Sequence, residues 1–135
     1  MVKKINHVAI AVPDIGAAAR FYEQYLGLKL AGTERVPSNK VKVGFLPVGE
    51  SRIELVQPDA PDSPVAALIK KRGPGIQHLC LEVDDIDAEL ARLKAAGVRL
   101  INEAPVPGAH GYRVAFVHPS ATGGVLLELS QSPKQ

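Results

Sequence analysis

Hydrophobic and polar residues alternate along several short stretches of the chain, and the first of these is residues 3–12. There Val8, Ile10 and Val12 fall on one side of an extended chain, and His7 falls on the other. Successive side chains of a β-strand point to opposite faces, so this alternation predicts a strand with one apolar face. Similar patterns predict strands over residues 28–34, 40–46, 51–57, 77–83, 98–102, 112–118 and 124–130.

Three stretches between these strands have the start and stop signals of helices. Asp14 and Asp85 are each placed to cap the N-terminus of a helix, and a glycine ends both helices. Ser63 followed by Pro64 predicts a third helix start, because proline is favoured at the first helical position after a serine cap. The predicted elements therefore run strand, helix, three strands, then a connecting helix, and then the same series again.

This repetition is visible in the sequence itself. Residues 5–15 read Ile-Asn-His-Val-Ala-Ile-Ala-Val-Pro-Asp-Ile, and residues 76–86 read Ile-Gln-His-Leu-Cys-Leu-Glu-Val-Asp-Asp-Ile. A repeat of about 70 residues is too long for a solenoid unit and indicates two copies of one module. We expect an α+β fold in a single domain, residues 1–135, whose two βαβββ modules form a curved mixed sheet. Residues 3–57 are the first module, 58–75 a connector with a helix, and 76–135 the second module.

Composition excludes several classes of function. Hydrophobic residues make up 46% of the 135-residue chain and charged residues 22%, as in an ordinary soluble globular domain. A net charge of +2 without clustered aromatics is unlike a nucleic-acid-binding protein. No apolar run approaches the roughly 20 residues that cross a bilayer, and no signal peptide precedes the first strand. We expect a cytoplasmic protein with no nucleic-acid or membrane partner.

Four side chains with metal-binding chemistry fall on the faces opposite the apolar ones. His7 and Glu54 belong to the first module, and His78 and Glu128 stand at matching places in the second. One histidine or glutamate in a strand is usually an ordinary hydrogen-bonded or solvated residue, but a matching pair in both modules favours a shared role. Because sheets twist, the two modules are expected to curl this face into a cleft. Imidazole and carboxylate ligands there suit a divalent transition metal.

Three further residues are candidates for contact with a substrate. Lys42 and Arg113 stand at matching places ahead of Phe45 and Phe116, and we expect them on the strand face that lines the cleft. There they either bind a substrate carboxylate or phosphate or merely solvate the sheet. His110 lies in a loop with three helix breakers at residues 105–111, and a loop of this kind can reach over a ligand.

The motifs resemble those of the vicinal oxygen chelate superfamily, also called the glyoxalase superfamily, and within it the methylmalonyl-CoA epimerase family. The resemblance is carried by the phrases Ile-Asn-His-Val-Ala at residues 5–9, Asp-Ser-Pro-Val-Ala at 62–66, Gly-Ala-His-Gly at 108–111 and Gly-Gly-Val-Leu-Leu-Glu-Leu at 123–129. It implies that His7, Glu54, His78 and Glu128 hold a divalent ion in the cleft, cobalt in many members, with zinc, manganese or nickel as alternatives. It also implies a homodimer. One departure is Lys42, which stands where some bacterial epimerases have a glutamate proposed as a base.

The function implied by this resemblance is the interconversion of (R)- and (S)-methylmalonyl-CoA. The reaction removes the α-proton and passes through a metal-stabilised enolate, with Glu54 and Glu128 as the catalytic carboxylates. One alternative is a lactoylglutathione lyase, which uses the same four ligands on another substrate. A second is a metal-free small-molecule binding protein of the same fold. A ring-cleaving dioxygenase fits less well, since it needs iron held by two histidines and one carboxylate.

Overall fold

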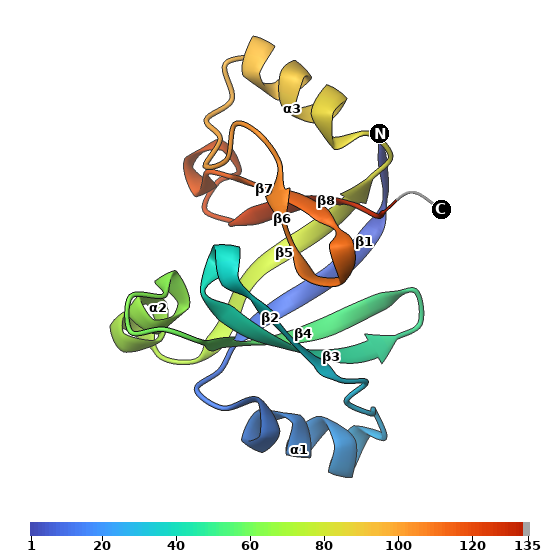
Figure 1. Ribbon diagram of the computed structural model, residues 1–135, viewed down its shortest axis with the longest axis vertical. Coiled ribbons are helices and arrows are strands. Elements are labelled where there is room, and N and C mark those ends of the chain that lie inside the picture. Colours follow the sequence, from blue (N-terminus) through green and yellow to red (C-terminus); the bar gives the residue numbers. More distant parts are fainter. Residues whose placement is uncertain (134–135) are drawn as a thin grey trace. The chain divides into compact units, whose positions relative to one another are not determined.

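The chain folds into two compact units in a computed structural model, which describes residues 1–133 (Figure 1). One unit contains His7–Gln77 and is called the α1 unit; the other contains Met1–Asn6 and the residues from His78 on, and is called the α3 unit. Strand β1 (Val2–Ala11) therefore contributes its first residues to the α3 unit and its last residues to the α1 unit. A buried hydrogen bond of 2.9 Å from Asn6 Nδ2 to Glu82 Oε1 ties the start of β1 into the α3 unit.

The strands of the α1 unit lie in the order β2-β3-β4-β1. Strand β1 runs parallel to β4 (Ser51–Pro58), and β3 (Val41–Val48) runs antiparallel to β4 and to β2 (Thr33–Val36). The unit also contains helices α1 (Ile15–Leu26) and α2 (Pro64–Arg72) and a short 3-10 helix, η1 (Pro37–Asn39).

The α3 unit repeats this arrangement with the strand order β5-β8-β7-β6. Strand β5 (Gly75–Val83) is parallel to β8 (Leu127–Gln131), and β7 (Arg113–Val117) is antiparallel to β8 and to β6 (Val106–Pro107). Helix α3 (Ile86–Ala95) and the 3-10 helices η2 (Ala109–Gly111) and η3 (Pro119–Ala121) complete it. Each unit thus has a mixed sheet, and the predicted α+β class is confirmed.

All three helices begin at the residues that the sequence predicts. Asp14 Oδ2 accepts a hydrogen bond from Ala17 N at 2.9 Å, and Asp85 Oδ1 accepts one from Ala88 N at 3.1 Å. Ser63 caps α2, with proline in the first turn. In the described part of the chain, none of the helices is both long and apolar enough to cross a membrane.

A repeated contact that the sequence did not reveal fixes each of the two matching helices to its sheet. The first N–H of α1, at Ile15, donates to Gln57 Oε1 of β4 at 2.9 Å. In the same way the first N–H of α3, at Ile86, donates to Gln131 Oε1 of β8 at 2.8 Å. A helix cannot satisfy its own first N–H groups, so a glutamine of the last strand does so in both units.

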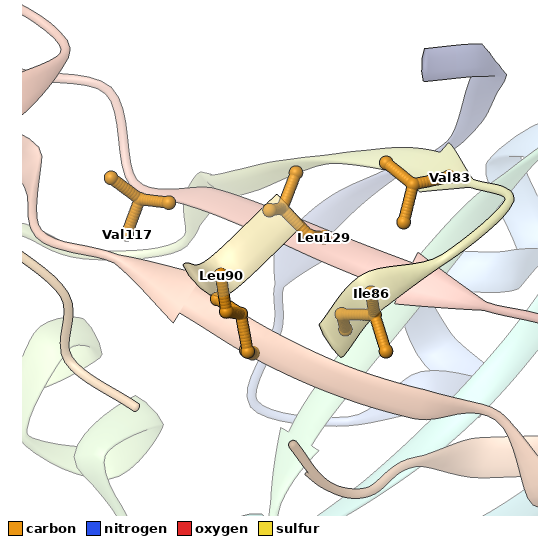
Figure 2. Close-up of a cluster of buried hydrophobic side chains, with 6 residues drawn as sticks. Val83, Ile86, Leu90, Val117 and Leu129 are labelled. Carbon is orange, nitrogen blue, oxygen red and sulfur yellow. The ribbon is translucent and has the colours of Figure 1, made fainter. Parts of the chain in front are cut away.

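The predicted apolar face of each sheet packs against a helix. In the α3 unit, Val83, Leu129 and Val117 meet Ile86 and Leu90 of α3, as Figure 2 shows. In the α1 unit the corresponding cluster contains Val12, Leu46 and Leu55 with Ile15 and Ala19 of α1. The opposite face of each sheet is thereby left for the histidines and glutamates.

Two predicted strands are largely wrong. Residues 28–32 and 98–102 form no strand, although each segment makes a few backbone hydrogen bonds with its neighbour. Ala31 N donates to Phe45 O at 2.8 Å, and Ile101 N donates to Phe116 O at 2.8 Å, in matching positions of the two units. Pairing then resumes later than expected, at Thr33 and at Val106. The third difference is at the end of the chain, where β8 begins at Leu127 rather than at residue 124.

We expect Ile86→Ala to lower the free energy of unfolding by about 2–5 kcal/mol, because it leaves a cavity under α3 where the side chain is fully buried. Urea denaturation followed by circular dichroism measures this change. The matched control is Ile101→Ala, because Ile101 is 51% exposed. Equal losses in the two variants would contradict the assigned core.

Candidate metal centre

Strands β1 and β4 bring His7 and Glu54 together in the α1 unit. Their register pairs His7 with Arg52 and Ala9 with Glu54, so these residues lie side by side on two parallel strands. His7 Nδ1 lies 3.2 Å from Glu54 Oε2. His7 is 6% exposed and Glu54 5%. A buried carboxylate is stable only with partners, and here an imidazole supplies one of them.

Arg52 is a second partner of the same carboxylate. Its Nε and Nη2 atoms donate to Glu54 Oε2 at 3.1 and 2.9 Å. The guanidinium also lies over the Phe45 ring, 5.7 Å from the ring centre. Our sequence analysis missed this residue. The signal was available, because a residue two positions before Glu54 on a strand must share its face.

Strands β5 and β8 form the matching pair in the α3 unit. His78 Nε2 lies 3.0 Å from Glu128 Oε1, and the residues are 8% and 5% exposed. The Phe116 ring contacts the His78 ring edge to face, with 5.2 Å between ring centres. Phe116 pairs with Glu128 in the sheet as Phe45 pairs with Glu54. The units thus use the same three residue types, histidine, glutamate and phenylalanine, in the same register.

The repeat is broken at two places next to these pairs. The residue two positions before Glu128 is Leu126, so the α3 unit has no arginine in the place of Arg52. Cys80, which pairs with Glu128 in the sheet, stands where the first module has Ala9. The Cys80 thiol donates to Ser130 Oγ at 3.2 Å, and both side chains are buried.

The donor atoms of each pair fit a divalent ion. A metal bound to histidine nitrogen and carboxylate oxygen at about 2.0–2.2 Å holds two neighbouring ligands about 2.9–3.4 Å apart. The separation of 3.0 Å between His78 Nε2 and Glu128 Oε1 lies in this range. In the α1 unit, Arg52 already donates to the oxygen that lies 3.2 Å from His7, so Glu54 would bind an ion through its other oxygen, Oε1. Each pair therefore offers one imidazole nitrogen and one carboxylate to an ion. The chemistry of the four donors suits a first-row transition metal.

The predicted face of Lys42 and Arg113 is wrong. Lys42 shares its face of β3 with Leu46, which packs against α1. Arg113 shares its face of β7 with Ala115 in the core under α3. Its guanidinium makes two hydrogen bonds with Asp87 of α3, at 2.8 and 2.9 Å. Both residues stand three positions before a phenylalanine, and an odd separation along a strand places two residues on opposite faces.

The two remaining histidines lie in turns of the α3 unit. His110 is in η2 with a left-handed backbone, φ 57°, and its contact with a substrate stays a prediction. His118 Nδ1 accepts a hydrogen bond from Ser120 N at 3.0 Å, so this side chain caps η3. It therefore has a structural role.

Comparison with known proteins agrees with this geometry. The family model described as glyoxalase/bleomycin resistance protein/dioxygenase superfamily matches residues 6–116. Methylmalonyl-CoA epimerase, mitochondrial, of Bos taurus is 42% identical over 130 residues, which cover 96% of this chain and 74% of the relative. The chain belongs to the methylmalonyl-CoA epimerase family of this superfamily.

Two more members of the methylmalonyl-CoA epimerase family extend the match. The ethylmalonyl-CoA/methylmalonyl-CoA epimerase of Cereibacter sphaeroides is 43% identical over 133 residues, covering 97% of this chain and 99% of the relative. The crystal structure of methylmalonyl-CoA epimerase from Mycobacterium tuberculosis superposes with a TM-score of 0.94 at 37% identity, covering 98% of this chain and 90% of that chain. The predicted fold is confirmed by these matches.

The ion pair of Arg113 with Asp87 predicts a pH-dependent contribution to stability. Hydrogen bonds from Arg113 hold the pKa of Asp87 below its usual value. A carboxyl with a depressed pKa stabilises the fold above its unfolded-state pKa and loses this effect as the pH falls through its folded-state pKa. We expect Arg113→Met to be slightly less stable than the native chain at neutral pH. Urea denaturation should show that this difference disappears in acid, and a difference that persists there would contradict the assignment.

Proposed function

We propose that this chain is an enzyme that interconverts the (R) and (S) epimers of methylmalonyl-CoA. The observation that carries the proposal is the buried histidine–glutamate pair on the same face of both units. The relatives described above bear the name of this activity and match nearly the whole chain. The alternative of a lactoylglutathione lyase uses the same ligands and the same proton chemistry, so only the substrate separates the two.

Epimerisation sets two demands on the residues. A proton must leave the carbon between the thioester and the carboxylate, and a proton must then return to the opposite face of the planar intermediate. One group therefore accepts on one side while another donates on the other. We assign these roles to Glu54 and Glu128, which stand at matching places in the two units. General acid–base catalysis of this kind contributes about 10²- to 10⁴-fold to the rate.

The reaction also requires stabilisation of the negative charge that develops on the thioester oxygen. We propose that His7, Glu54, His78 and Glu128 together hold one divalent ion per chain, cobalt in the first place, with zinc, manganese or nickel as alternatives. When bound, such an ion acts as a Lewis acid on the developing charge. The residues of the chain hold the ligands in place: the Phe116 ring fixes the plane of His78, and burial keeps water away from both pairs. We also propose that the protein works as a cytoplasmic homodimer.

The direct test is an assay with a single epimer of methylmalonyl-CoA. We expect its conversion to the other epimer, loss of this activity after treatment with a chelator, and recovery on addition of cobalt. Elemental analysis should find one ion per chain, whereas the metal-free binding protein considered as an alternative would hold none. Ethylmalonyl-CoA should be assayed in parallel, because the Cereibacter sphaeroides relative is named for both compounds. Turnover of the methylglyoxal–glutathione hemithioacetal without epimerisation would contradict the proposal.

The roles of the two carboxylates are tested by Glu54→Gln and Glu128→Gln. Glutamine keeps the size of the side chain but accepts no proton, so each variant should lose exchange of the α-hydrogen with deuterated solvent by about 10²-fold or more for one epimer. Exchange is measured by mass spectrometry from each pure epimer. Equal losses from both epimers in both variants would argue against one carboxylate on each side.

A further inference from the structure

Glu54 and Glu128 occupy equivalent places, and the residue two positions before each of them differs: it is Arg52 in the α1 unit and Leu126 in the α3 unit. Two N–H groups of Arg52 reach Glu54 Oε2, at 3.1 and 2.9 Å. His7 Nδ1 also approaches Oε2, at 3.2 Å. Each of these contacts thus falls on one oxygen of the carboxylate. These contacts fix the direction in which Oε2 points. Because the carboxylate is planar, they also fix the direction of Oε1.

Arg52 is itself held in place. Its guanidinium lies over the Phe45 ring at 5.7 Å, and Phe45 pairs with Glu54 in the sheet. Only 23% of the Arg52 side chain is exposed. Arginine donates through a rigid planar fork, so an arginine fixed in this way orients a carboxylate better than a flexible lysine does. Arg52, Phe45 and Glu54 therefore form one ordered group on β3 and β4.

Charge and geometry make opposite predictions for the effect of Arg52 on a metal ion. A guanidinium beside the carboxylate offsets its negative charge, so charge alone predicts that removing Arg52 strengthens binding of a divalent cation. If Arg52 acts by orienting Glu54, its removal should instead weaken binding of the cation. Groups that hydrogen-bond to metal ligands typically change metal affinity by about 10- to 100-fold when they are removed. The sign of the change thus tells the two effects apart.

We propose that Arg52 is a positioning residue, which holds Oε2 of Glu54 so that this carboxylate offers the single oxygen Oε1, as ligand to a divalent ion and, when it leaves the ion, as acceptor of the proton. The proposal rests on the proposed function, since it requires that the chain bind a metal. In the α3 unit the matching place holds Leu126, whose side chain cannot donate a hydrogen bond. Of the two carboxylates, Glu54 is the one that Arg52 fixes.

The experiment is a titration of metal-free protein with Co²⁺ in competition with a chelator, together with the visible absorption spectrum of the bound ion. Two variants separate geometry from charge. Arg52→Met removes both the positive charge and the planar guanidinium, whereas Arg52→Lys keeps the positive charge and removes only the planar guanidinium. The matched control is Arg35→Met, which removes another arginine–carboxylate pair of the same unit, Arg35 with Asp59 at 3.0 Å. Thermal unfolding of the metal-free proteins shows that each variant is folded.

We expect Arg52→Met and Arg52→Lys to bind Co²⁺ about 10- to 100-fold more weakly than the native chain, with altered absorption bands, and Arg35→Met to bind normally. Tighter binding by Arg52→Met, or normal binding by Arg52→Lys, would mean that only charge matters and would overturn the inference. Normal binding by Arg52→Met would overturn it as well while leaving the proposed function intact. Failure of the native chain to bind Co²⁺ would overturn both.

Discussion

The period of the β-strand keeps the two faces of each sheet chemically separate. Side chains at even spacing share a face, so one parity of each strand collects the apolar residues that pack on a helix and the other collects histidines and carboxylates. Leu55 of β4 packs in the core under α1, while Glu54, its neighbour in sequence, lies beside His7. In the α3 unit, Leu129 and Glu128 divide in the same way. The core of each unit thus fixes where its ionisable pair points.

Burying these groups is costly, and the arrangement of each pair offsets that cost. All four side chains are at most 8% exposed. A carboxylate removed from water needs hydrogen-bonding partners or a cation, and in both units an imidazole nitrogen lies within 3.2 Å of the carboxylate. A divalent ion would be a stronger partner than a proton for the same atoms. Burial thus also serves the site, because a charged ligand interacts more strongly with groups in the protein interior than with groups in water.

The departures from the repeat suit a reaction with two unlike sides. Duplication of a module supplies matching carboxylates, but the two faces of a planar carbon that carries a thioester, a carboxylate and a methyl group are mirror images and not identical. Arg52 in one unit and Leu126 in the other make the two carboxylates unequal. Cys80 in the place of Ala9 adds a second difference beside Glu128. Each unit therefore keeps the shared pair and varies its neighbours.

The sequence by itself determined the local features: the repeat, the three helix starts at Asp14, Ser63 and Asp85, and the face of each strand on which a histidine or glutamate falls. These follow from short-range periodicity and capping, which need no knowledge of distant contacts. The correct face of Lys42 and Arg113 was also within reach, since it depends only on counting along a strand. Only the tertiary structure decided which groups pair, as Arg113 does with Asp87 and Arg52 with Glu54. It alone also showed that residues 98–102 meet β7 through a few backbone hydrogen bonds without forming a ladder. Strand pairing and side-chain partners depend on where separate segments meet, and alternation within one segment does not encode that.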